Sequence, residues 1–347
     1  MKTEANDIQS IISSATEPAE LKIAHEEIDR YMKRIVYQVE LHEVRGLFTE
    51  INRLHHSIKS KAIKLAEIEL NIKETDRFCW GMMGSGAREE QTVRTDQDNC
   101  LFYDEGTMKE EVVSFSSAGV KNLAEAGYPL CSGNVMATNP RWNFASTVWN
   151  DSHIPPIVFE DVRYAYILLD VIPIYGNASL LNKVKEKWKL TLCNDGQLLV
   201  KMRETAANLH VPLSPLGKIF TERYGNQAGK FNIKIHAYAP LIIAVKYLSL
   251  MAGINEVNTY TRLERLSQRG IIDEYLRREL TSALDLFLLL RLNNSAFTPF
   301  HKVPLDYIDL ESLTKENAHL LKKGLKIVKK LQKVLKRRGC ECEAPEQ

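Results

Sequence analysis

The spacing of apolar residues changes twice along this chain, and that change limits the folds the chain can adopt. Between residues 18 and 70, apolar residues recur at helical spacing with charged residues between them. Between about 75 and 176, apolar and aromatic residues form short runs bounded by glycine or acid, which favours strands. After Gly176 the helical spacing returns. We therefore expect an α+β fold that is mostly helical, with a small mixed sheet between an N-terminal helical segment and a C-terminal helical bundle.

Turn-forming residues and periodicity together place the individual elements. Thr16 can cap a first helix that has Pro18 in its first turn. Strands are expected in RFCWGMM (77–83), NCLFYD (99–104) and RYAYILLDVIPIYG (163–176). Helices are expected over 114–127, 178–190, 196–209, 239–254, 259–268, 272–291 and 315–338. The expected domains are an N-terminal helical region (1–70), a sheet domain (71–180) and a C-terminal helical domain (181–347).

Composition excludes several classes of protein. The chain has 46 Lys and Arg residues against 44 Asp and Glu residues, so its formal charge of +2 gives no general attraction to nucleic acid or anionic lipid. No uninterrupted apolar stretch reaches the length of a membrane span, and the first residues lack the apolar core of a signal peptide. Six scattered cysteines in a chain of 347 residues indicate reduced thiols. We expect a cytoplasmic protein with neither a membrane nor a nucleic acid as its partner.

Two closely spaced acids follow a glycine-rich turn in the segment from 82 to 104. Asp96 and Asp98 stand two residues apart in an expected strand, where the side-chain period of two directs both carboxylates to one face. Two converging carboxylates need cations to neutralise them, and their hard oxygen atoms suit Mg²⁺ or Mn²⁺. Asp96 and Asp98 are therefore candidate metal ligands. Acids at this spacing also occur in ordinary loops and helix caps, and that interpretation stays open.

Gly84 and Ser85 form the turn, at a point where the chain is expected to pass into a helix beginning near residue 87. Glycine lets phosphate oxygens approach backbone N–H groups, the serine adds a hydroxyl donor, and a helix N-terminus adds partial positive charge. Arg88, in the first turn of that helix, would supply a cation to the phosphates. The turn is a candidate triphosphate site, with an ordinary turn as the alternative. A Walker A loop is excluded because no Gly-Lys-Ser/Thr sequence follows the glycines.

The same segment carries a family resemblance. GSGAREEQTVRTDQDN (84–99) closely resembles the signature of the DUF294 nucleotidyltransferases, relatives of the GlnD-type PII uridylyltransferases in the DNA polymerase β-like superfamily. Ala87 replaces the second glycine of that signature. GYPLCSGNVMATNPRW (127–142) and LLDVIPIYGN (168–177) are similar to further motifs of the family. The resemblance implies a polymerase β-like nucleotidyltransferase sheet and Asp170 as a third carboxylate of the metal site; the alternative for Asp170 is an acid at a strand end that faces water.

The C-terminal helical region is similar to the substrate-binding domain of the same family. The similarity lies in residues 232–254, 261–266 and 288–294, and its motifs are weaker than those of the sheet domain. Lys234, Arg262 and Arg291 are the candidate substrate-binding residues in these segments. Ordinary charges on helix surfaces or between helices are the alternative interpretation of all three.

The resemblance also implies a function. A related enzyme would transfer UMP or AMP from a nucleoside triphosphate, UTP or ATP, to a hydroxyl group on a protein acceptor, with release of pyrophosphate and a role in signalling. Two alternatives stay open. One is a regulatory module that binds a nucleotide without turnover, and the other is a nucleotidyltransferase that acts on a small molecule or an RNA end. The residues select neither the base nor the acceptor, and they do not indicate an oligomeric state.

The last expected helix, residues 315–338, has leucine and valine along one face and lysines elsewhere. A basic amphipathic helix can bind an acidic protein, a nucleic-acid backbone or a membrane surface. No aromatic residue interleaves the lysines, as a nucleic-acid surface would favour. We therefore predict a helix of the terminal bundle, with its apolar stripe packed inward and its lysines in water.

Overall fold

The computed structural model describes residues 2–72, 75–93, 95–146, 161–296, 298–299 and 306–337. The chain divides into two compact units. The first unit contains residues 1–36, 46–191 and 298–303, and the second contains residues 37–45, 192–297 and 304–347. As predicted, the described residues are mostly helical, with a small mixed sheet.

Helices α1 (Lys2–Ser14), α2 (Pro18–Ile35) and α3 (Val44–Glu69) come first in the chain. Helix α1 was not predicted, because it buries only a short apolar stripe centred on Ile8 and Ile12. The residue that caps α2 is Glu17, so the prediction of Thr16 was wrong. The carboxylate of Glu20 accepts hydrogen bonds from the backbone N–H groups of Thr16, at 2.6 Å, and of Glu17, at 3.4 Å. This reach back across the first turn satisfies donors that the helix leaves without an internal partner.

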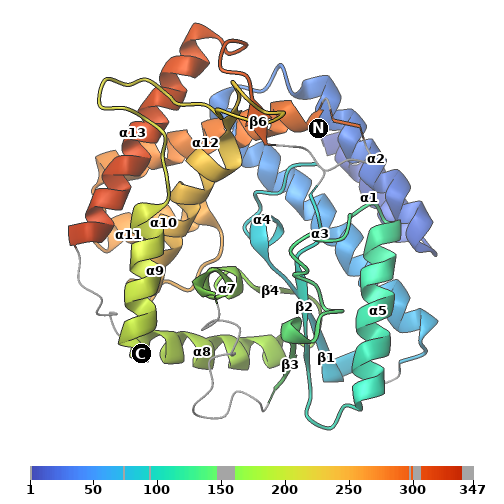
Figure 1. The fold of residues 1–347 in the computed structure, drawn as a ribbon. Coiled ribbons are helices and arrows are strands. Elements are labelled where there is room, and N and C mark those ends of the chain that lie inside the picture. The colour runs from blue at the N-terminus through green and yellow to red at the C-terminus, as the bar shows by residue number, and fades with distance from the viewer. Residues whose placement is uncertain are drawn as a thin grey trace. The chain divides into compact units, whose positions relative to one another are not determined.

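Four strands form the mixed sheet of the first unit in the order β3-β2-β1-β4 (Figure 1). They are β1 (Phe78–Met82), β2 (Asn99–Tyr103), β3 (Asn143–Ala145) and β4 (Ile172–Gly176). Strand β1 pairs antiparallel with β2 and with β4, whereas β2 pairs parallel with β3. Strand β3 was not predicted, and it has only three residues.

Helices α3 and α5 (Lys109–Glu125) supply the apolar cover of the central strand. Alternate residues of β1 point to one face, since the side-chain period of a strand is two. Phe78 and Trp80 both contact the ring of Phe115 in α5, with ring centroids 4.9 and 5.8 Å apart. A Cβ atom at Gly119 would lie 2.5 Å from the Trp80 ring, so only glycine allows α5 to approach this closely.

The third expected strand is shorter than predicted. Residues 162–168 form helix α7 (Val162–Leu168), and β4 begins only at Ile172. The side chain of Asp161 caps α7 by accepting a hydrogen bond from the backbone N–H of Arg163 at 2.9 Å. A continuous apolar run does not distinguish a buried helix from a buried strand, and the capping acid is a helix-start signal in front of this run. Asp170 therefore lies in the turn between α7 and β4.

The second unit is a helical bundle with one short strand pair. Its helices are α9 (Gly196–Asn208), α10 (Ala239–Met251), α11 (Thr259–Gln268), α12 (Glu274–Ala296) and α13 (Lys315–Arg337). Helix α8 (Ala178–Asn194) ends at the start of this unit, and strands β5 (Phe231–Asn232) and β6 (Tyr307–Ile308) pair antiparallel. Short helical turns span Leu41–Glu43, Thr75–Arg77, Pro140–Trp142 and Lys234–Tyr238. The helices predicted after Gly176 are therefore all present, with ends that differ by a few residues.

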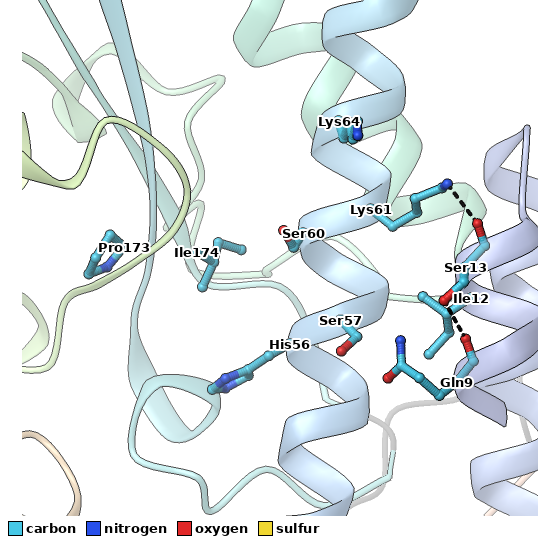
Figure 2. Close-up of a pocket in the computed structure, with 10 residues that line it drawn as sticks. All are labelled: Gln9, Ile12, Ser13, His56, Ser57, Ser60, Lys61, Lys64, Pro173 and Ile174. Carbon is cyan, nitrogen blue, oxygen red and sulfur yellow. Dashed lines mark hydrogen bonds between the residues drawn. The ribbon is translucent and has the colours of Figure 1, made fainter. Parts of the chain in front are cut away.

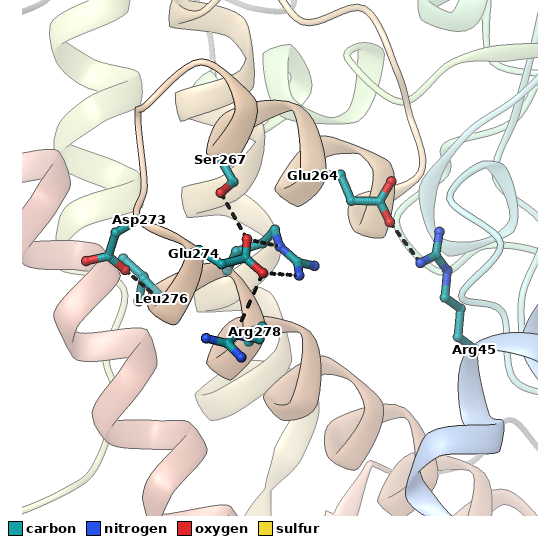
Figure 3. A network of polar contacts seen from close by, with 8 residues as sticks. Arg45, Glu264, Ser267, Asp273, Glu274, Leu276 and Arg278 are labelled. Carbon is teal, nitrogen blue, oxygen red and sulfur yellow. Dashed lines mark hydrogen bonds and ion pairs between the residues drawn. The ribbon is translucent and has the colours of Figure 1, made fainter.

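Figure 3 shows polar contacts at α11 and at the start of α12, one of them to Arg45 of the segment 37–45. Arg45 at the end of that segment donates to the carboxylate of Glu264 in α11 at 2.9 Å, and its guanidinium lies over the Tyr260 ring. At the start of α12, Glu274 accepts hydrogen bonds from Arg277 and from Ser267 of α11. These pairs are partly exposed, so each contributes little stability by itself.

The last helix packs as predicted. The stripe residues of α13 are fully buried, and they are Leu321, Leu325, Val328, Leu331 and Leu335. Lys329 and Gln332 also donate to backbone carbonyls of Leu213 and Leu209, at 2.6 and 2.8 Å. The apolar face of α13 is thus part of the core of the second unit. Among the helices of the described ranges, none combines the length and the apolarity that crossing a membrane requires.

Candidate active site

The acid pair lies in an extended segment just before β2. The prediction that Asp96 and Asp98 belong to a strand was wrong, because β2 begins at Asn99. Side chains nevertheless alternate in this segment: the two aspartates are half-buried, whereas Gln97 and Asn99 between and after them are buried. Gln97 donates from Nε2 to the backbone carbonyl of Tyr128 at 3.2 Å. The two amides anchor the segment in the core and leave the two carboxylates on its other face.

The two carboxylates converge with a cysteine. Ligand atoms of Asp96, Asp98 and Cys131 all lie within 4.8 Å of one another. Burial raises the pKa of the Cys131 thiol to about 12, and the negative charges of Asp98 and Asp96 act in the same direction. The thiol therefore stays protonated, so the hard oxygen atoms of the aspartates are the ligands of choice. This donor set fits Mg²⁺ or Mn²⁺, as the sequence predicted, and the metal role of the acids stays a prediction.

The glycine turn touches Asp98 directly. Gly84 has a φ of +66°, and a Cβ atom there would lie 2.3 Å from Oδ2 of Asp98. The backbone N–H of Met83 also donates to the carbonyl of Asp98 at 3.0 Å. The structure therefore brings together Gly84, the half-buried Ser85 and the two acids, which the sequence had only placed near one another in the chain.

The helix predicted to begin near residue 87 is absent. Instead, α4 (Gly84–Ala87) is a single turn that ends at Arg88. Glu89 then adopts a φ of +61°, and the N–H of Glu90 returns to the carbonyl of Ser85 at 2.8 Å. One turn does not carry the dipole of a full helix, so the predicted contribution of a helix N-terminus is missing here.

Arg88 and Asp170 contact each other. The guanidinium of Arg88 donates from Nε to Glu90 at 2.7 Å and from Nη1 to Oδ2 of Asp170. Arg88 is only 5% exposed and both carboxylates are 0% exposed. The proposed alternative for Asp170, an acid that faces water, is therefore wrong. Asp170 is not part of the cluster formed by Asp96, Asp98 and Cys131, and its role as a metal ligand and that of Arg88 as a phosphate ligand stay predictions.

Sequence reasoning missed the contribution of α3. Lys59 is 4% exposed, donates from Nζ to Oε1 of Gln91 at 2.6 Å, and lies 4.7 Å from the centroid of the Tyr128 ring. One turn earlier, Nε2 of His56 donates to the carbonyl of Gly86 at 2.9 Å. Helix α3 therefore contacts the glycine turn through His56 and the segment after it through Lys59. The available signal was a lysine at an inward-facing position of an amphipathic helix, one residue after the buried Ile58.

The buried ammonium of Lys59 gives a pH-dependent prediction. Burial lowers the pKa of Lys59 from 10.5 to about 8, against the opposing effect of Asp98 and Asp96. Between these values the folded protein binds fewer protons than the unfolded chain, so stability rises with pH; below pH 8 both states are protonated. The stability of the wild type relative to Lys59→Met is expected to rise by up to about 3 kcal/mol across this interval. Urea denaturation of both proteins at pH 7.5 and 10 measures this change in relative stability. The same difference in the free energy of unfolding at both pH values would contradict the prediction.

The candidate residues of the second unit fall into two groups. Lys234 and Arg291 both approach Asp306, with N–O distances of 3.9 and 2.7 Å, and the Arg291 guanidinium also lies over the Tyr238 ring. Arg262 is buried and donates from Nε to the backbone carbonyl of Glu256 at 2.7 Å. The structure thus joins two of the three residues at one carboxylate and places the third in a separate contact. Their roles in substrate binding stay predictions.

Comparison with protein families agrees with this geometry. Residues 26–154, which include the glycine turn and both aspartates, match the family described as "Putative nucleotidyltransferase DUF294". Residues 196–338 match the family described as "Putative nucleotidyltransferase substrate binding domain". Asp170 lies between the two matched ranges, and the comparison with curated proteins found no match. The mixed sheet, the acid pair and these matches define a nucleotidyltransferase-like protein with a domain of substrate-binding type. The chain belongs to the DUF294 family.

Proposed function

We propose that this protein transfers a nucleoside monophosphate, UMP or AMP, from a nucleoside triphosphate to a hydroxyl group of a protein acceptor, in the manner of the PII uridylyltransferases. The observation that carries the proposal is the contact between the Gly84 turn and Asp98, whose carboxylate converges with that of Asp96. A phosphate-binding turn and a pair of hard anionic ligands are the two elements that phosphoryl chemistry needs from a protein.

In the proposed reaction, an oxygen of the acceptor attacks the α-phosphorus, the bond from that phosphorus to the bridging oxygen breaks, and pyrophosphate leaves. A bound Mg²⁺ or Mn²⁺ would neutralise charge on the phosphates and favour loss of the proton from the attacking hydroxyl. Asp96 and Asp98 would hold the ion, with Asp170 as a further ligand. The backbone N–H groups of the Gly84 turn and the hydroxyl of Ser85 would position the phosphates.

Asp170 and Arg88 would act as a coupled pair in this proposal. The two side chains are partners in the structure, so a divalent ion bound at Asp170 would compete with the guanidinium for the same carboxylate. Arg88 would then be available to the anionic triphosphate, for which a guanidinium is a suitable donor. Both predicted roles are thereby consistent with the observed contact.

The test uses wild type and the Asp96→Asn/Asp98→Asn variant with α-labelled UTP or ATP, Mg²⁺ and native lysate as the acceptor source. We expect label transfer and pyrophosphate release to fall by at least about 100-fold in the variant. Glu105→Gln/Glu110→Gln removes two exposed acids of the same unit and is the control with equal charge change. Equal inactivity of wild type and variant with every acceptor fraction would remove support for catalysis. Magnesium-dependent nucleotide binding without pyrophosphate release would instead identify the regulatory module.

A further inference from the structure

A groove in the first unit lies between α1, α3 and β4 (Figure 2). Its volume is about 460 Å³, a size typical of pockets for small molecules. The wall from α3 is polar and includes His56, Ser57, Ser60, Lys61 and Lys64. Among the described residues that line the groove, none is acidic. The groove therefore carries positive charge and no lining carboxylate. The carboxylate of Glu20, which lies outside the lining, interacts electrostatically with Lys61.

The two lysines of this wall lie at the same side of α3, where residues three apart are neighbours. Lys61 is held in place by its hydrogen bond from Nζ to the backbone carbonyl of Ser13 in α1, at 3.1 Å. Lys64 is exposed, and no described carboxylate forms an ion pair with it. Figure 2 shows Ser57 and Ser60 on the neighbouring turns of the helix. The Ser57 hydroxyl donates to the backbone carbonyl of Arg53 at 3.1 Å, so Ser60 is the candidate hydroxyl donor for an anion. Ammonium and hydroxyl donors together are the chemistry that recognises phosphate.

The groove also adjoins two segments of the proposed active site. His56 lines the groove and donates from Nε2 to the carbonyl of Gly86 in the glycine turn, at 2.9 Å. Pro173 and Ile174 line its opposite side and belong to β4, which follows Asp170 in the chain. A molecule in the groove would therefore touch His56, which bonds to the turn, and the strand that follows the third acid in the chain.

We propose that this groove binds a phosphate-bearing small molecule at a site separate from the nucleotide donor. The proposal rests on the proposed function only in treating the Gly84 turn and the two aspartates as the donor site. The shared chemistry is a phosphate or diphosphate group, which either a free anion or a nucleotide effector can supply. The volume of the groove accommodates either.

Calorimetric titration of the full chain with inorganic pyrophosphate, in EDTA and at low salt, tests the site. We expect Lys61→Ala/Lys64→Ala to weaken binding by at least about 10-fold, since both positive charges of the groove are removed. Lys109→Ala/Lys201→Ala removes two exposed lysines outside the groove and is expected to bind as the wild type does. Lys64→Glu reverses one charge without touching the bond to Ser13, so it tests the site even if the double variant loses its fold.

Two further arms separate this proposal from the proposed function and distinguish the sources of phosphate. The Asp96→Asn/Asp98→Asn variant is expected to bind pyrophosphate with unchanged affinity in EDTA, even if no nucleotidyl transfer is ever observed. In that variant, tighter binding of ATP or UTP than of pyrophosphate, still sensitive to Lys64→Glu, identifies a nucleotide, and equal binding identifies the free anion. The proposal is overturned if wild type does not bind pyrophosphate, if the lysine variants bind it as well as wild type does, or if binding is lost with the two aspartates.

Discussion

Replacing Arg88 with methionine is expected to lower the free energy of unfolding of the first unit by about 3 to 5 kcal/mol. The guanidinium is buried and pairs with the fully buried carboxylates of Glu90 and Asp170. Methionine has a similar length but leaves both carboxylates in the interior without that positive charge. The tryptophans within the described ranges are Trp80, Trp142 and Trp188. All three belong to the first unit, so their fluorescence during urea denaturation reports on this unit.

Two further variants make the Arg88 prediction specific. Arg88→Lys keeps the positive charge but lacks the guanidinium that donates to both carboxylates. It should lower the free energy of unfolding less than Arg88→Met does. Arg88→Met/Asp170→Asn removes one of the two stranded charges, so it should recover part of the lost stability. If Asp170 is a metal ligand, 10 mM Mg²⁺ should stabilise Arg88→Met more than it stabilises wild type. A loss below about 1 kcal/mol in Arg88→Met would show that the buried pair does not hold this part of the fold.

The second large effect is expected from Gly84→Ala. A methyl group at this position would stand 2.3 Å from Oδ2 of Asp98, far inside any real contact, and the φ of +66° disfavours a side chain. Either the carboxylate or the turn must move, and both belong to the proposed site. We expect metal-dependent nucleotide binding to weaken by at least about 10-fold, while stability falls by only about 1 to 3 kcal/mol.

Gly106→Ala is the matched control for Gly84→Ala. Gly106 follows β2 in the same unit, its φ is not in the left-handed region, and nothing lies within 4 Å of a Cβ atom there. Calorimetry with a non-hydrolysable nucleoside triphosphate and Mg²⁺ compares the three proteins, and the midpoint of urea denaturation confirms that each is folded. If Gly84→Ala binds the nucleotide as tightly as wild type does, the turn is not part of the donor site.

Much of the fold could be predicted from local pattern, because most helices bury an uninterrupted stripe and end at clear signals. Helix α11 has the predicted bounds 259–268, and α10 begins beside Pro240 and is followed by Gly253 with a φ of +64°. The predictions failed where a few polar contacts outweigh the pattern. Asp161 caps α7 within a strand-like run, and α4 is followed by a bond from the N–H of Glu90 back to the carbonyl of Ser85.

The candidate site shows the same limit on a larger scale. The convergence of Asp96 and Asp98 depends on residues two apart, so a period of two suffices to predict it even though the segment lies outside the strand. The pairing of Arg88 with Asp170 joins residues 82 positions apart, and that of Lys59 with Gln91 joins residues 32 apart. The spacing of residues along the chain does not predict contacts between residues so far apart in the sequence. They arise only when the helices and the sheet have packed.

Helix α3 makes contacts that bear on how this protein is dissected. Its His56 holds Gly86, its Lys59 holds Gln91, its His55 donates to or accepts from the Tyr128 hydroxyl at 2.8 Å, and its Glu67 pairs with Tyr175. A shortened protein that starts after residue 69 would keep every residue of the sheet. It would lose α3, and with it the contacts to Gly86, Gln91, Tyr128 and Tyr175. Fragments for expression and crystallisation should therefore begin before α3 rather than at the first strand.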